Sequence, residues 1–290
     1  MRKLRIVLSI DGGGIRGVLP LSILKYIHEL FIEEKIASSI NERLDLLAGT
    51  STGAIISAAL MLDDGKKPLY IPEDIINLYS VRGEQIFSRE RPEKRNEYPL
   101  KLILESSFGD LTLCDLQKHF LFVSYDQDKK KPFIFHDRLG KYRELPLAKV
   151  LLACSAVPGY FPPVPLEGSF LSDGIQTAKN PALLALKHAE NVFHDDTILL
   201  LSIGTGELPD SLFDKCEEHV FSVEKELKLL AANNDKFIYH RLQPKIEKGS
   251  FEMDDSSSAN IKNLLLDGEK YIEENKSNIK GIVEEIKKYG

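Results

Sequence analysis

Residues 49–53 read Gly-Thr-Ser-Thr-Gly, and this G-x-S-x-G motif constrains the fold more than any other feature of the chain. The mostly apolar run 44–48 before it predicts a strand, and the run 54–61 after it predicts a helix. A serine on such a turn projects its hydroxyl out of the sheet, and the flanking glycines leave room for a substrate carbonyl. The start of the helix adds positive charge and free amides where an oxyanion would form. The motif also arises by chance, with glycines that serve packing alone, but this context predicts a nucleophilic Ser51.

The composition is that of one large globular domain. The 290 residues are 43% hydrophobic and 28% charged, which is enough to bury a full core. We therefore expect residues 1–290 to form a single domain. The net charge of −6 argues against a general nucleic-acid binder, because duplex binding normally needs a basic face that displaces counterions.

The cysteines and the apolar runs bear on the compartment. Cys114, Cys154 and Cys216 are widely spaced and odd in number, so they indicate neither a disulfide framework nor paired metal ligands, and a reducing cytoplasm fits best. The apolar stretch 6–10 is too short for the core of a signal peptide. A helix that spans a bilayer needs a run of about 18 apolar residues, and the sequence contains none. We therefore expect a cytoplasmic protein whose contact with a phospholipid membrane surface is peripheral.

Strand-like and helix-like segments alternate along the chain, which predicts an α/β fold with a mostly parallel sheet. The expected strands are 4–10, 121–125, 133–135, 170–172 and 197–203, and the expected helices are 18–31, 54–61, 149–157 and 181–189. The pattern is weak from 63 to 110. Within that stretch, residues 82–101 carry six basic and four acidic side chains, which is more typical of a solvated face than of a lipid-headgroup patch. The tail 260–290 predicts C-terminal amphipathic helices packed on the domain, split near 275–278.

A second glycine-rich segment, Asp-Gly-Gly-Gly-Ile-Arg-Gly at 11–17, ends the first predicted strand. Successive glycines let backbone amides converge on negative charge, so Gly12, Gly13 and Gly14 are candidates for an oxyanion hole. The segment also matches the G-x-G-x-x-G dinucleotide fingerprint, and a dinucleotide-binding protein is the weaker alternative. A Rossmann fold would place an acidic residue at the end of the second strand, where this chain has Gly49 instead.

The serine needs a base, and the residues leave two kinds of candidate open. In an α/β-hydrolase order a late histidine such as His194 or His240 would serve. Asp173 is the other candidate, because it lies between apolar residues and a glycine at the end of a predicted strand. Such a carboxylate would have to gain basicity from burial or act on a hydroxyl that the site acidifies. An Asp-Gly pair is also a common turn, which would explain Asp173 without chemistry.

Several motifs in this order resemble the patatin-like phospholipase family. They are the segments 11–17 and 49–53, the segment 153–163, Ser-Asp-Gly at 172–174 with Asn-Pro-Ala at 180–182, the run 201–206, and Met-Asp-Asp at 253–255. The resemblance covers nearly the whole chain. It implies a three-layer α/β/α sandwich and lipid acyl hydrolase activity, with a Ser-Asp dyad and without a catalytic histidine, metal or cofactor.

The resemblance also implies a role for individual residues. Ser51 would be the nucleophile and Asp173 the general base, and the amides of Gly12, Gly13 and Gly14 would form the oxyanion hole. Arg16 would hold the loop or add positive charge. One departure is Ile175, where the family often has glycine or alanine, and this side chain could narrow the space beside Asp173.

The expected activity is that of a phospholipase A or lysophospholipase that cleaves fatty-acyl esters at a membrane surface. The alternative is an effector phospholipase that a cyclic nucleotide activates in antiviral defence, because some bacterial patatin-like enzymes act in cyclic-oligonucleotide antiphage signalling. A homo-oligomer would accompany that form of regulation. No segment of the sequence identifies a nucleotide pocket.

Overall fold

The computed structural model describes residues 3–86, 98–212 and 214–289, so most of the predicted charge cluster at 82–101 lies outside the described residues. The strands are β1 Leu4–Ile10, β2 Leu46–Thr50, β3 His119–Asp126, β4 Lys131–His136, β5 Val164–Leu166, β6 Ser169–Asp173, β7 Thr197–Ile203 and β8 Phe237–Leu242. The helices are α1 Val18–Glu33, α2 Thr52–Leu60, α3 Pro72–Ile86, α4 Tyr98–Phe108, α5 Leu147–Ser155, α6 Ile175–Ala178, α7 Ala182–Phe193, α8 Lys215–Ala232 and α9 Ser258–Lys288.

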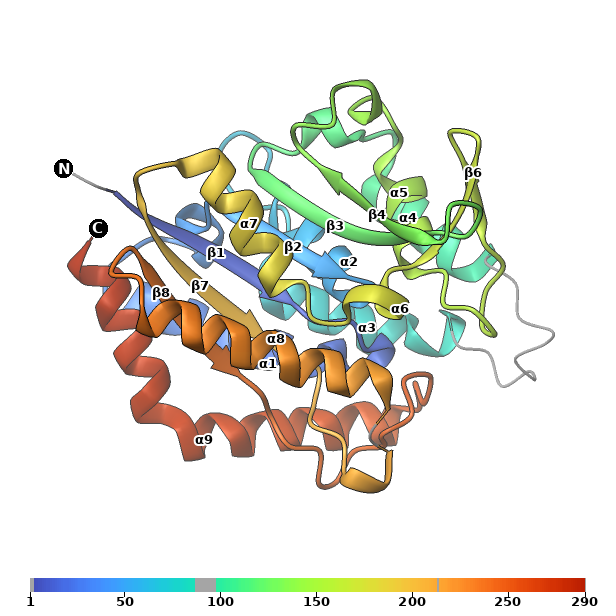
Figure 1. The fold of residues 1–290 in the computed structure, drawn as a ribbon. Helices are drawn as coiled ribbons and strands as arrows, with labels where there is room; N and C mark the ends of the chain where they lie inside the picture. Colours follow the sequence, from blue (N-terminus) through green and yellow to red (C-terminus); the bar gives the residue numbers. More distant parts are fainter. Residues whose placement is uncertain (1–2, 87–97, 213, 290) are drawn as a thin grey trace.

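The described strands form one eight-stranded sheet in the order β5-β6-β3-β2-β1-β7-β8, with β4 paired to β3 (Figure 1). The pairings between β1, β2, β3, β7 and β8 are parallel, and those of β4, β5 and β6 are antiparallel. The predicted mostly parallel sheet is therefore confirmed, with an antiparallel addition at one edge.

Helices cover both faces of the sheet. Val7 of β1 packs with α7 and α8, whereas its neighbours Ile6 and Leu8 pack with α1, α2 and α9 on the opposite face. This alternation follows from the two-residue period of a strand. In Figure 1, α7 and α8 cross in front of the strands. The arrangement confirms the predicted three-layer α/β/α sandwich.

The sheet brings the two glycine-rich segments together. β1 and β2 are neighbouring parallel strands in which Ile10 lies opposite Gly49. The loops that follow them therefore leave the same edge of the sheet side by side. This is the edge at which ligands bind in open α/β folds, outside the carboxyl ends of the strands.

The C-terminal segment differs from its prediction, since α9 is one helix of 31 residues and not two pieces. The Asn275 side chain, where the break was expected, donates to the Tyr271 carbonyl oxygen at 2.9 Å within the same helix. Ile279 and Ile282 beyond it are buried in the main core, so packing continues past the polar stretch. No helix among the described residues is long and apolar enough to cross a membrane.

The docking of α9 on α1 predicts a position-specific effect on stability. A Cβ atom at Gly268 would lie 2.1 Å from the Ser22 hydroxyl oxygen, whereas one at Gly281 would meet nothing within 4 Å. We expect Gly268→Ala to lower the free energy of unfolding by about 1–3 kcal/mol, the usual cost of overpacking. Gly281→Ala, the matched control on the same helix, should be neutral or stabilise by up to about 1 kcal/mol. Urea unfolding of both variants checks this, and equal effects would contradict the packing argument.

Candidate active site

Ser51 lies on the turn between β2 and α2, as the motif predicts. Its backbone has φ 55° and ψ −126°, a conformation that non-glycine residues rarely adopt, and 4% of the residue is exposed. A Cβ atom at Gly49 would lie 2.1 Å from the Gly53 carbonyl carbon, and one at Gly53 would lie 2.2 Å from the Ile10 oxygen. Strain of this kind is stored where surrounding structure holds it, typically at functional sites. The two glycines therefore permit the turn on which Ser51 is presented.

Asp173 ends β6 and is fully buried. It lies opposite Ser124 of β3, one residue beyond the point where Val123 lies opposite Thr50 of β2. Strand β6 thus continues along β3 where β2 ends, and this places Asp173 beside Ser51. The carboxylate is held in turn, because its Oδ1 atom accepts a hydrogen bond from the Ile175 amide at 2.8 Å.

The glycine after Asp173 is also required by packing. A Cβ atom at Gly174 would lie 2.6 Å from both the carbonyl oxygen and the Cγ1 atom of Val123. The predicted Asp-Gly turn is therefore a close approach to β3 that aims the carboxylate. Ile175, the departure from the family pattern, contributes its backbone amide to that carboxylate.

Burial raises the pKa of Asp173 from 3.8 to about 7, against the opposing effects of the Ser51 hydroxyl and the Ile175 amide. The Oδ2 atom has no partner that meets hydrogen-bond geometry, so the contact with Ser51 is looser than a normal hydrogen bond. Catalytic hydrogen bonds in enzymes without substrate are often long in this way. A carboxylate with this pKa is a far stronger base than an exposed aspartate.

The glycine loop after β1 has most of its backbone groups committed. Of the three predicted oxyanion donors, the Gly12 amide is not free to serve, because it donates to the Lys179 carbonyl oxygen at 3.0 Å. The Gly12 carbonyl accepts from Thr205 Oγ1 at 2.7 Å, and the Gly13 carbonyl accepts from the Arg16 amide at 3.2 Å. In the described part of the chain, the amides of Gly13 and Gly14 donate to no protein acceptor.

The direction of the two remaining amides follows from peptide geometry. In a trans peptide the N–H points opposite to the preceding C=O in the same plane. Holding the Gly12 carbonyl at Thr205 therefore turns the Gly13 amide the other way, and holding the Gly13 carbonyl at Arg16 does the same for Gly14. Thr205 lies in the run 201–206 that contributes to the family resemblance, but the sequence analysis assigns it no role.

Arg16 is 3% exposed and lies behind the loop. Its Nε atom donates to the Gly13 carbonyl oxygen at 3.4 Å, and its Nη1 atom has no hydrogen-bond partner in the structure. Burial lowers the pKa of Arg16, with partial compensation from Glu217, Glu252 and Asp214. This contact is the one expected for the first of its two predicted roles, that of holding the loop.

An apolar pocket opens beside Ser51. The wall comes mainly from α3 and α4, together with loop residues near the elbow. Its lining includes Gly14, Ile15, Ser51, Thr52, Ile55, Ile75, Leu78, Tyr79, Leu100, Leu104, Val157 and Phe161. A cleft with aliphatic and aromatic walls and a few polar groups at one end is suited to a long hydrocarbon chain.

The Thr52 amide is a group that the sequence interpretation missed. In serine hydrolases of the G-x-S-x-G type, the N–H of the residue after the nucleophile contributes to the oxyanion hole. Thr52 opens α2 and lines the pocket with Ser51. The position after the serine in the motif was the signal that could have identified it.

The histidine alternatives lie elsewhere. His194 follows α7 and precedes β7, so it lies at the amino ends of the parallel strands, whereas Ser51 lies at their carboxyl ends. His240 lies within β8 and pairs through Nε2 with Glu285 of α9 at 2.9 Å.

Among the described residues, no group of three or more His, Cys, Asp and Glu side chains is placed to hold a metal ion.

A serine on a strained elbow, beside a glycine loop and an apolar pocket, defines a serine esterase. The family model of the patatin-like phospholipase matches residues 8–186. The chain therefore belongs to the patatin-like phospholipase family, and it is a lipid acyl hydrolase that acts on ester bonds. This finding also weighs against the dinucleotide-binding alternative.

The relatives agree with this membership. The chain is 27% identical to patatin-04/09 of Solanum tuberosum over 93% of its own length and 84% of the relative. It is 29% identical to patatin group M-2 of the same species over 74% of its length and 63% of the relative. Among solved structures, human GIVD cytosolic phospholipase A2 in complex with methyl gamma-linolenyl fluorophosphonate and terbium chloride has a TM-score of 0.55 at 12% identity. That likeness, which shows the fold alone, covers 99% of this chain and 60% of that chain.

Burial of Asp173 predicts how the stability of the fold depends on pH. Its pKa is about 7 in the folded protein and 3.8 as the ordinary value, so between these pH values the folded chain keeps a proton that the unfolded chain releases. Stability is therefore lost as the pH rises through this window. Asp173→Asn should escape this loss, gaining stability over wild type by on the order of 4 kcal/mol between about pH 4 and pH 7. Urea unfolding across this range measures the gain, and a constant difference would contradict it.

Proposed function

We propose that this chain cleaves the fatty-acyl esters of phospholipids and lysophospholipids, with Ser51 as nucleophile and Asp173 as general base. The observation that carries the proposal is the buried Asp173 carboxyl, whose pKa is raised to about 7, beside a strained serine at an apolar pocket. A base works best when its pKa lies near the working pH. No histidine is needed if the carboxylate itself has this basicity.

The chemistry proceeds in two steps. In the first, Asp173 takes the proton of the Ser51 hydroxyl while Oγ bonds to the ester carbonyl carbon. The tetrahedral intermediate collapses with loss of the alcohol, to which the protonated Asp173 returns the proton, and the acyl group stays on Ser51. In the second, Asp173 takes a proton from water as the water oxygen attacks the acyl-enzyme. The fatty acid is released and Ser51 recovers its proton.

The oxyanion forms twice, and the loop is preorganised for it. The amides of Gly13 and Gly14 donate to no protein acceptor among the described residues. Their direction is fixed because the preceding carbonyl groups, those of Gly12 and Gly13, accept hydrogen bonds from Thr205 and Arg16. Donors that are in place before reaction cost no reorganisation in the transition state, and each contributes typically about 3–4 kcal/mol. The buried guanidinium of Arg16 adds positive charge behind the same loop.

The pocket supports a long-chain acyl substrate. Leu78 and Ile75 of α3, with Leu100 and Leu104 of α4, line its wall. Each buried methylene contributes about 0.8 kcal/mol, so a long chain gains more from the pocket than a short one. We therefore expect long-chain esters to be preferred over acetyl or butyryl esters.

Release of fatty acid from mixed phospholipid vesicles, with a chelator present, tests the dyad. We expect Ser51→Ala to abolish turnover and Asp173→Asn to lower it by roughly 10²–10⁴-fold, the range for loss of a general base. His240→Gln is the matched control, since His240 is a partly buried ionisable residue paired away from the site, and it should retain wild-type turnover.

Wild-type turnover in Asp173→Asn would refute the dyad. Silence of the wild type that a panel of cyclic nucleotides relieves would favour the effector alternative, in which activity waits for a ligand. Light scattering on the same samples would show whether assembly accompanies activation.

The pKa of Asp173 also predicts the pH profile. Because the ionised carboxylate is the active form, kcat/KM should rise about tenfold per pH unit below about pH 7 and level off above it. Initial rates on a soluble ester between about pH 5 and pH 9 measure this. A midpoint near pH 4, the ordinary value for an aspartate, would contradict the role of burial.

A further inference from the structure

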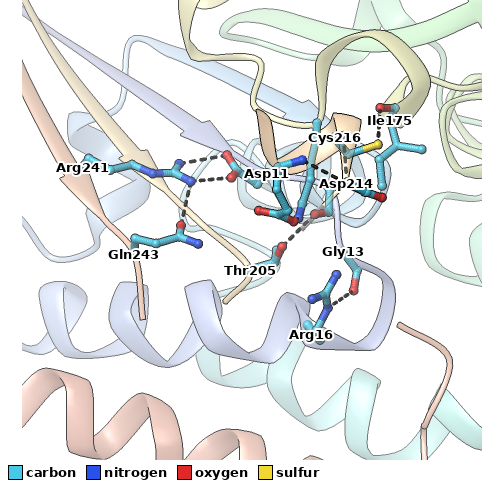
Figure 2. A network of polar contacts seen from close by, with 12 residues as sticks. Asp11, Gly13, Arg16, Ile175, Thr205, Asp214, Cys216, Arg241 and Gln243 are labelled. Carbon is cyan, nitrogen blue, oxygen red and sulfur yellow. Dashed lines mark hydrogen bonds and ion pairs between the residues drawn. The ribbon is translucent and has the colours of Figure 1, made fainter. Parts of the chain in front are cut away.

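The glycine loop begins at Asp11, whose carboxylate is held by a buried arginine from a distant part of the chain (Figure 2). Arg241 donates from Nη1 to Oδ1 at 2.9 Å and from Nη2 to Oδ2 at 2.5 Å. The two side chains are 3% and 2% exposed. This two-pronged geometry fixes orientation as well as distance.

Arg241 reaches Asp11 across a strand. It lies on β8 opposite Ser202 of β7, and β7 in turn neighbours β1. On the way its guanidinium donates to Ser202 Oγ at 2.7 Å and to Gln243 Oε1 at 2.6 Å. A Cβ atom at Gly204 would lie 2.7 Å from Nη2 of Arg241, so this glycine keeps the path clear.

Arg241 keeps its proton and acts only through its contacts. Burial acts to lower the pKa of Arg241, but the adjacent Asp11 carboxylate outweighs it, and the net pKa is raised above its ordinary value. Both oxygens of Asp11 accept hydrogen bonds from Arg241. Arg241 therefore stays charged, and the influence of the pair on the site is geometric.

That influence passes directly to the amides of the loop. The Asp11 amide donates to the Ile203 carbonyl at 3.1 Å, which continues the β1–β7 pairing by one residue. The next residue is Gly12, whose carbonyl is held by Thr205 at 2.7 Å and so directs the Gly13 amide. Figure 2 shows Asp11, Thr205 and Gly13 next to one another between Arg241 and Arg16.

We propose that Arg241 is a positioning residue for the oxyanion loop: by clamping the Asp11 carboxylate it fixes the start of the loop, so that the Gly13 and Gly14 amides face the developing oxyanion. The inference rests on the function proposed above. It assigns a role in the reaction to a residue that lies beyond the segment 8–186 matched by the family model.

The test must avoid a trivial loss of folding. Removing one member of a buried pair leaves an unpaired charge and destabilises the protein. The double variant Asp11→Asn/Arg241→Gln instead replaces both charges by neutral amides, and the shorter glutamine does not reach across β7, so the clamp is lost without leaving a charge unpaired. Its control is Arg5→Gln/Asp196→Asn, which removes the pair at 2.7 Å near the other end of β1 together with the contact of Arg5 with Asp45 at 3.0 Å.

We expect Asp11→Asn/Arg241→Gln to lower kcat on a soluble p-nitrophenyl ester by roughly 10²-fold, the loss typical of one oxyanion donor. KM should stay within about twofold, because the substrate's acyl chain binds elsewhere in the pocket, and the unfolding temperature should match that of the control. The control should keep wild-type kcat. Arg241→Lys should give an intermediate kcat, since an ammonium keeps the charge but not the planar fork.

A kcat for Asp11→Asn/Arg241→Gln equal to that of the control would overturn the inference. If the double variant does not fold, Arg241→Lys decides: a lower kcat at unchanged KM and unfolding temperature supports positioning, and an unchanged kcat overturns it. Ser51→Ala is assayed alongside. Activity that persists in it would refute the proposed function, and with it the inference, whereas activity that depends on Ser51 leaves the Arg241 result to be judged on its own.

Discussion

The close approach of backbones at the carboxyl ends of β1 and β2 is the constraint on which the rest of the site depends. The turn at Ser51 is strained, and it exists because Gly49 meets Gly53 and Gly53 meets Ile10 at distances that exclude a Cβ atom. The same contact presses α2 against the end of β1, so it also places the glycine loop beside the serine. The strained backbone conformation of Ser51 is thus tolerated because the packing of β1, β2 and α2 around it holds it in place.

Burial of Asp173 sets chemistry against stability. A carboxylate enclosed by the sheet is destabilised in its charged form, and the raised pKa is the measure of that cost. The Ile175 amide offsets only part of it, and the loosely placed Ser51 hydroxyl leaves Oδ2 without a proper donor. A better-satisfied Asp173 would be a weaker base. The unsatisfied oxygen is therefore consistent with function, in the way that native proteins depart from full hydrogen bonding at their sites.

The sequence predicted the central strands and the glycine motifs well, because each combines a short apolar run with a turn signal. β1 and β7 were predicted to the residue, and the strands expected at 121–125 and 133–135 lie within β3 and β4. It did not predict α8 or β8. Helix α8 buries few apolar side chains, among them Val223 and Leu227, so its periodicity is weak, and β8 is an edge strand whose residues are mostly half-buried. A single sequence does not show which backbone groups form hydrogen bonds with distant parts of the chain. No local pattern shows that Lys179 occupies the Gly12 amide, which left three candidate donors where the structure leaves two.

The proposed oxyanion hole depends on which backbone groups of the glycine loop are already hydrogen-bonded to other parts of the chain. Successive glycines make many amides available, and a donor set arises only when other parts of the chain occupy the groups that must point elsewhere. Thr205 donates to the Gly12 carbonyl oxygen, and the Met253 carbonyl oxygen accepts a hydrogen bond from the Ile15 amide. Arg241 holds the Asp11 carboxylate at the start of the loop. All three lie beyond residue 186, where the matched family segment ends. The residues proposed to perform the chemistry lie within that segment, whereas these three residues, which orient the glycine loop, lie beyond it, so the C-terminal part of the chain supports the geometry on which the proposed site depends.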